Sequence, residues 1–289
     1  MAGSIRGSGV LRHTWKWLRA RPLGALSIGL IAALVVLALL APALTPYDPL
    51  AQDASSQAKA PSASHPLGTD YLGRDVLSRV IIGVRPSLGV GLVSVAIALV
   101  AGSTLGLVSG YLGGTVDLVL QRVVDVLLTL PGLVLALALL AIVGTGFASL
   151  IGVIAVVLSP GIARVVRSAT LVVTASGYIE SARAIGAGDA RIVVRHVLPN
   201  TLATILVLAS LNLGNAILFE AALSFLGLGV QPPQPSWGNM LSGPARAYFE
   251  VAPWMAVFPG IAVSLSVLGF NLLGDTLRDA FDPRLRSVT

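Results

Sequence analysis

"YIESARAIGAGDARIVVRHVLPN", residues 178–200, is a polar interruption in a chain otherwise rich in Leu, Val, Ala, Ile and Gly. Its charged residues are two acids and three arginines: Glu180, Asp189, Arg183, Arg191 and Arg195. Gly186 and Gly188 break the middle of the stretch, and proline, which fits the first turn of a helix, follows Leu198. The stretch therefore predicts a short amphipathic helix, a glycine hinge, a turn-rich second segment and a return into apolar sequence.

Helical spacing places four residues of this stretch on one small, partly apolar face: Tyr178, Ala182, Ile185 and Gly186. Glu180 and Arg183 are three residues apart and are expected to pair beside that face. A surface helix of this kind can lie on lipid headgroups or dock into a groove on a protein. The narrow face and modest net charge favour docking.

The composition around this stretch is that of a membrane protein. Of the 289 residues, 55% are hydrophobic and only 11% are charged, and the mean hydropathy is +0.87. A soluble domain carries about a quarter charged residues. The net charge of +6 then indicates basic residues retained on the cytoplasmic side rather than a nucleic-acid partner. The chain has no cysteine, which excludes disulfides and thiolate metal sites.

Six apolar stretches are long enough to cross a bilayer, for which about 20 residues are needed. They cover residues 23–44, 86–109, 118–143, 147–173, 201–226 and 254–274. The first follows a basic run and could be a signal peptide, but its apolar core is longer than such peptides use, so a retained span is expected.

The basic residues orient the chain. With the N-terminus in the cytoplasm, most of the 19 Lys and Arg residues fall on the cytoplasmic side, residues 178–200 included. The outer side keeps only Lys59, Arg74, Arg79, Arg85 and Arg246. The N- and C-termini are both expected in the cytoplasm.

The spacing within residues 178–200 resembles the EAA signature of ABC-importer permeases. Glu180-Ser181-Ala182 is followed after three residues by Gly186, and after nine more by His196-Val197-Leu198-Pro199. Ser181 and His196 depart from the usual Ala and Ile, and the His-x-Leu-Pro-Asn ending is similar to the peptide/nickel branch. A literal Glu-Ala-Ala begins at Glu220, but its glycine and Leu-Pro spacing do not match, and it falls on the outer side.

Three further segments resemble the same branch. They are "HPLGTDYLGRDVLSR" (65–79), "EAALSFLGLGVQPPQPSWGNML" (220–241) and "LGDTLRDAFDPRL" (273–285). The resemblance implies an all-α membrane protein, a type I ABC importer permease with six transmembrane helices and a cytoplasmic coupling helix. It also implies a multi-pass location in the bacterial inner (plasma) membrane.

The apolar stretches and the placement of basic residues predict the domain organisation as well. We expect a cytoplasmic N-terminal segment (1–22), a first transmembrane helix (23–44) and an external loop with an amphipathic segment (45–84). A five-helix permease core (85–275), including the coupling segment 175–200, and a cytoplasmic tail (276–289) follow.

Partners and substrate also follow from the resemblance. A homologous second permease, two ATPase subunits or a fused ATPase, and an extracytoplasmic binding protein would complete an importer of di- or oligopeptides; nickel, haem or glutathione-like solutes are the alternatives. The chain has no G-x-x-x-x-G-K-[ST] phosphate loop, so ATP and magnesium are expected on the ATPase subunits and no cofactor on this chain.

The coupling residues implied by the resemblance are Tyr178, Glu180, Ser181, Ala182, Arg183, Ile185, Gly186, His196, Leu198 and Pro199. Polar residues elsewhere are candidates for pathway or partner contact: Asn212, Asn215, Glu220, Asp70, Arg74 and Asp75. Arg122 and Asp125 are expected to pair, and a solvated charge cluster is the alternative for residues 70–75.

The three histidines have no metal-ligand spacing and no catalytic set is clustered. No metal site and no catalytic residue is therefore expected, which disfavours a membrane-embedded enzyme. An ion-coupled secondary transporter remains the alternative from another class, although no internal repeat supports it.

Overall fold

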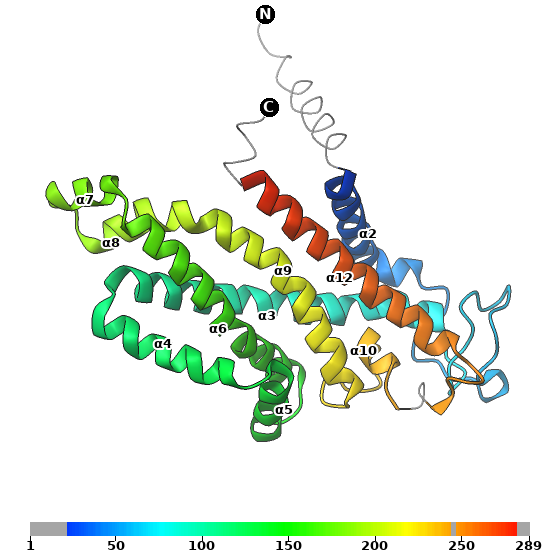
Figure 1. Cartoon of the computed structure of the whole chain (residues 1–289). Coiled ribbons are helices and arrows are strands. Elements are labelled where there is room, and N and C mark those ends of the chain that lie inside the picture. The colour runs from blue at the N-terminus through cyan, green and yellow to red at the C-terminus, as the bar shows by residue number, and fades with distance from the viewer. Residues whose placement is uncertain (1–21, 244–246, 282–289) are drawn as a thin grey trace, which may run out of the picture.

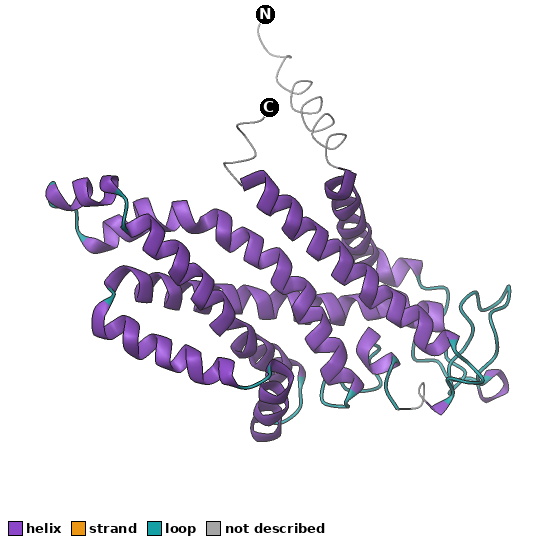
Figure 2. Ribbon diagram, viewed as in Figure 1, coloured by secondary structure: helices purple, strands orange, loops and turns teal. Residues whose placement is uncertain are grey.

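The computed structural model describes residues 22–243 and 247–281, and within them every element of regular structure is helical (Figure 2). Five helices are long and apolar enough to cross a membrane: Pro22–Leu44 (α2), Val76–Leu112 (α3), Phe147–Thr174 (α6), Asp189–Phe225, whose main part is Leu198–Phe225 (α9), and Trp254–Phe281 (α12). A bent pair, Gly114–Thr129 (α4) and Gly132–Val143 (α5), can supply a sixth span. The expected all-α membrane fold is confirmed.

The third expected span, 118–143, is not one helix. α4 and α5 meet at a bend of 95°. Leu130 has an extended backbone (φ −89°, ψ 137°) and precedes Pro131. A residue before proline is disfavoured in the helical region, so the chain breaks there.

The loop between α2 and α3 is shorter than the expected 45–84. α3 begins at Val76, because the Asp75 carboxylate accepts a hydrogen bond from the Ser78 backbone amide at 2.8 Å and caps the helix. Residues 45–75 contain one short 3₁₀ helix, Ala54–Ser56, and no separate amphipathic helix. The residues expected to form the end of the loop are the first turns of α3.

The expected tail also differs, because α12 continues to Phe281 rather than ending before 276. The N-terminal segment 1–22 lies outside the described residues apart from Pro22.

α3 and α6 approach closely along a row of glycines one turn apart. A Cβ added at Gly102, Gly106 or Gly110 would lie 2.6–2.9 Å from atoms of α6, backbone carbonyl oxygens among them. In lipid, helices associate by such close packing rather than by hydrophobic exclusion. The glycines therefore set the distance between the two central helices.

A second link ties α2 to α3. Pro42 lies inside α2 and has no N–H for the carbonyl four residues earlier, which is that of Ala38. Arg85 of α3 donates from Nε to this carbonyl at 2.7 Å and from Nη2 to Leu39 O at 3.1 Å. The arginine thus satisfies a backbone acceptor that would otherwise lack a partner in the membrane.

The two ends of the bundle carry different features (Figure 1). Gly177–Ala184 (α7) and Asp189–Ile192 (α8) project at one end. The loop before α3 and Trp237–Met240 (α10) lie at the other end. Two polar regions are therefore held apart by the length of α3 and α9.

The glycine row leads to a first prediction. Gly106→Ala is expected to lower the melting temperature of the detergent-solubilised protein, because the new methyl would meet Ala163 O at 2.6 Å and overpacking costs about 1–3 kcal/mol. Gly89→Ala on the same helix is the control, since a Cβ added there would meet no atom within 4 Å apart from the adjacent backbone of α3 itself. Equal melting temperatures for the two variants would contradict this packing.

Candidate functional site

The polar stretch forms a helical hairpin between two spans. α6 ends at Thr174, α7 follows at Gly177, and α8 begins the long helix that becomes α9. The segment projects from the bundle (Figure 1). A force applied to α7 therefore acts directly on both α6 and α9.

The expected face of α7 is divided between two sides of the helix. Ile179 is fully buried and Ala182 nearly so, and both belong to the hydrophobic core shared by α3, α6 and α9. Tyr178 is 48% exposed and Ile185 is 85% exposed. The assignment of Ala182 to the exposed face was wrong, because Ile179 and Ala182, three residues apart, form an inward stripe.

The outward side of the hairpin keeps most of the predicted residues. Exposed there are Tyr178, Glu180, Ser181, Arg183, Ile185 and Gly186. Gly186 has a φ of +79°. Its N–H donates to Arg183 O at 2.9 Å, and the N–H of Ala187 donates to Ala182 O at 3.1 Å. This pair of bonds is a Schellman cap, which needs a left-handed residue and so favours glycine.

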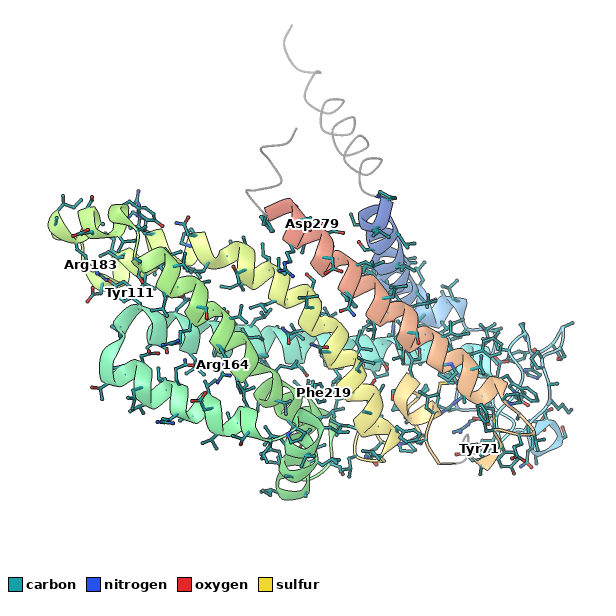
Figure 3. The ribbon with its side chains drawn as sticks, in the orientation of Figure 1. Tyr71, Tyr111, Arg164, Arg183, Phe219 and Asp279 are labelled. Carbon is teal, nitrogen blue, oxygen red and sulfur yellow. The ribbon has the colours of Figure 1, made fainter. Side chains whose placement is uncertain are left out.

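Tyr111, at the end of α3, anchors the hairpin. Its hydroxyl donates to Asp189 Oδ1 at 2.6 Å, and the Arg183 guanidinium lies 5.4 Å from its ring centroid. Figure 3 shows Tyr111 and Arg183 next to each other. The expected Glu180–Arg183 pair is absent from the described residues, since Arg183 stacks on Tyr111 instead. The one sequence signal for Tyr111 is a lone aromatic residue just before the glycine pair that ends a span.

The second half of the stretch is helical rather than turn-rich. A π-helical turn, Val193–Val197, joins α8 to α9. Pro199 cannot donate to Arg195 O, and a wider turn at this place accommodates the missing bond. Leu198 opens α9, and the His196 ring lies 6.4 Å from that of Tyr178, centroid to centroid. His196 and Tyr178 thus link the return helix to α7.

The candidate residues in the loop before α3 form an interior network. Asp70, Arg74 and Asp75 are each less than 10% exposed. Asp70 Oδ2 lies 2.7 Å from Arg74 Nε and 3.5 Å from Arg79 Nε. Asp75 accepts from the Ser78 hydroxyl at 2.8 Å and faces His65 Nδ1 at 2.9 Å. A solvated charge cluster does not describe these three residues, because they are buried and fold the loop before α3 onto that helix.

An exposed carboxylate of the same loop caps its 3₁₀ helix. Hydrogen bonds from the hydroxyls of Ser56 and Ser55, and from the Ser55 amide, lower the pKa of Asp53 to about 2. The cap therefore stays ionised at neutral pH.

The polar residues of α9 differ in accessibility. Asn212 is buried and donates to Leu208 O at 2.8 Å, whereas Asn215 is exposed. Glu220 is fully buried and its Oε1 accepts from the Ser224 hydroxyl at 2.8 Å. Of these three, Asn215 alone is free to face a pathway or a second subunit.

Two ion pairs join α4 to α6. Arg167 donates to both oxygens of Asp117, at 2.6 and 2.5 Å, and Arg164 pairs with Asp125. The expected Arg122–Asp125 pair was wrong, because α4 lies along α6 and brings a second arginine within reach. Such inter-helix partners carry no local sequence signal.

Within the described part of the chain, no group of three His, Asp or Glu side chains could hold a metal ion.

Comparisons with known proteins identify relatives over nearly the whole chain. Residues 102–287 match the family model of the binding-protein-dependent transport system inner membrane component. Residues 9–61 match the N-terminal transmembrane domain of oligopeptide transport permease C.

Two curated permeases are similar in sequence. The chain is 42% identical to the dipeptide transport system permease protein DppC of Alkalihalophilus pseudofirmus, over 96% of this chain and 90% of that one. It is 48% identical to the glutathione transport system permease protein GsiD of Pectobacterium atrosepticum, over 72% and 69% respectively.

A solved structure shares the fold. An inward-facing MetNI methionine ABC transporter chain aligns with a TM-score of 0.55 at 24% identity, over 73% of this chain and 96% of that one.

The anchor at Tyr111 leads to a second prediction. Tyr111→Phe removes the hydrogen bond to Asp189 and keeps the aromatic face, so amide exchange in residues 187–192 should rise about fivefold, as expected for about 1 kcal/mol. Tyr111→Leu removes both contacts and should extend the faster exchange to α7. Hydrogen-exchange mass spectrometry measures both, and unchanged exchange in the two variants would show that Tyr111 anchors nothing.

Proposed function

Because this chain belongs to the family of binding-protein-dependent transport system inner membrane components, we propose that it forms half of the pathway of an ATP-driven importer of short peptides. The match to a dipeptide permease over 96% of the chain supports this solute class. The glutathione permease supports it too, since glutathione is itself a tripeptide. An extracytoplasmic binding protein would deliver the peptide.

The α7–α8 hairpin is the observation that carries this proposal. Its outward side exposes Tyr178, Arg183 and Ile185. Its inward side is anchored in the core through Ile179 and Ala182. An exposed apolar side chain on a short, well-anchored helix suits insertion into a protein groove. We infer that an ATPase subunit binds here.

The anchors explain how movement would reach the membrane spans. α7 follows α6 after a two-residue turn and α8 is continuous with α9, while Tyr111 ties the hairpin to α3. A shift of the bound ATPase would therefore displace three helices of one core together. Rigid transmission of this kind switches a cavity between two faces of the membrane.

The remaining partners follow from the same proposal. The chain lacks a phosphate-binding loop, so two ATPase subunits, or one fused chain, would bind ATP and magnesium. A second, homologous permease would complete the pathway. The hairpin and both termini would lie in the cytoplasm and residues 45–75 outside, in a bacterial inner membrane, as the placement of Lys and Arg favours.

Ile185 provides the test of docking. Ile185→Ala is expected to weaken binding of the ATPase subunits at least about tenfold, which corresponds to about 1.4 kcal/mol. The fold should be unaffected because the side chain is 85% exposed. Ile142→Ala on α5 is the matched control, since Ile142 is 82% exposed and lies on a different helix. Co-purification and melting temperature measure the two effects, and equal ATPase recovery from both variants would exclude docking at Ile185.

Transport distinguishes the solutes. Proteoliposomes with the full assembly and binding protein should accumulate a labelled dipeptide only when ATP is supplied to the ATPase side. Labelled glutathione, nickel and haem are the alternative solutes, and ATP-dependent uptake of one of these without the dipeptide would reassign the substrate. Uptake by this chain alone in ATP-free vesicles would instead indicate an ion-coupled transporter.

A further inference from the structure

A small cavity lies at the end of the bundle that carries the loop before α3, away from the α7–α8 hairpin. Its volume is about 120 Å³. Asp70, Arg74 and Arg79 line one part of it, and Asn239, Ser242 and Met255 line another. Figure 3 labels Tyr71, a further wall residue, in this region. The cavity therefore lies where the loop before α3, the segment after α10 and the start of α12 meet.

The charges that line the cavity do not balance. Two arginines, each at most 6% exposed, share the carboxylate of Asp70. Asp70 Oδ1 already accepts from the backbone amides of Leu72 and Arg74, at 2.9 and 3.0 Å. Asp70 Oδ2 accepts from Arg74 Nε at 2.7 Å, and Arg79 Nε lies 3.5 Å away. One carboxylate thus serves two guanidinium groups.

The other nearby groups do not supply the missing negative charge. Asp75 is engaged by Ser78 and His65 and does not line the cavity. Arg79 Nη1 donates to Pro49 O at 3.0 Å, which is a neutral acceptor. The terminal nitrogens of Arg74 have no hydrogen-bond acceptor among the described residues, and this guanidinium lies 5.3 Å from the Tyr71 ring centroid. The cavity is consequently rich in donors and positive charge.

The size and donor geometry indicate which ligand fits. A water needs about 10–15 Å³ of such a volume, whereas pockets for whole drug-sized ligands measure about 300–1,000 Å³. The cavity accepts a single functional group rather than an entire peptide. The planar fork of arginine matches a carboxylate, whose two oxygens can each accept an N–H. A buried cation without a partner is unfavourable, so an anion there stabilises the folded loop.

We propose that this cavity binds one carboxylate group supplied from outside the chain. The carboxylate of a small solute and that of an acidic side chain on a binding protein share this chemistry. A carboxylate bound there would join the loop before α3 to the segment after α10 and to α12. The proposal depends on the side chains of this chain and not on the identity of the transported solute.

Thermal unfolding of the assembled transporter in lipid nanodiscs tests the site, with sodium acetate as the probe and sodium chloride at equal ionic strength as the reference. Acetate is expected to raise the melting temperature by about 2–4 °C and to saturate. Equal shifts in the two salts would overturn the proposal. If acetate gives no shift in a transporter that still carries out ATP-driven transport, the carboxylate site is excluded and the proposed transport function is not.

Matched variants avoid disrupting the arginine network. Ser242→Asp places a carboxylate on the cavity wall and should abolish the acetate shift while raising the melting temperature in chloride. Ser242→Asn has the same size without the charge and should keep the acetate shift. The same acetate response in both variants would refute a carboxylate site.

Two further measurements distinguish a carboxylate of a small solute from a carboxylate of the binding protein. Dialanine should compete with acetate, and dialanine amide should not, if a solute carboxylate enters the cavity. Abolition of the acetate shift by the binding protein without peptide would instead assign the carboxylate to that protein.

Discussion

The close contact of α3 with α6 is the constraint on which the other features depend. Gly102, Gly106 and Gly110 allow the backbones of two spans to approach without side chains between them. Each end of α3 then supports a different polar region. Tyr111 holds the α7–α8 hairpin at one end, and Asp75 and Arg79 hold the loop before α3 at the other. Had α3 and α6 packed through large side chains, these anchors would lie elsewhere.

Polar groups inside the bundle follow a consistent rule. Several carboxylates and arginines in the spans meet a specific protein partner, as lipid offers none. Arg85 satisfies a carbonyl freed by Pro42, Arg167 binds Asp117 with two nitrogens, and Glu220 receives the Ser224 hydroxyl. The first two contacts place α2 and α4 relative to their neighbours, and the third lies within α9.

The two sides of α7 differ in burial. The inward stripe of Ile179 and Ala182 fastens the helix to the core, and the outward side exposes Tyr178 and Ile185. The left-handed cap at Gly186 ends the helix so that the chain can turn back toward α9. Since α6, α9 and Tyr111 all hold the hairpin, it is coupled to the centre of the bundle.

The sequence alone determined the membrane class, the spans other than the broken 118–143 and the place of the polar hairpin, because apolar run length and the 180–199 spacing are local properties of the chain. It also predicted the break at Gly186, which has a left-handed backbone, whereas Leu198 and Pro199 lie within a helix that begins at Asp189. Only the tertiary structure decided that Ala182 faces inward, that Asp125 binds Arg164 and that Asp70, Arg74 and Asp75 are buried. These outcomes depend on which helices meet, and the sequence near each residue carries no record of a partner many positions away.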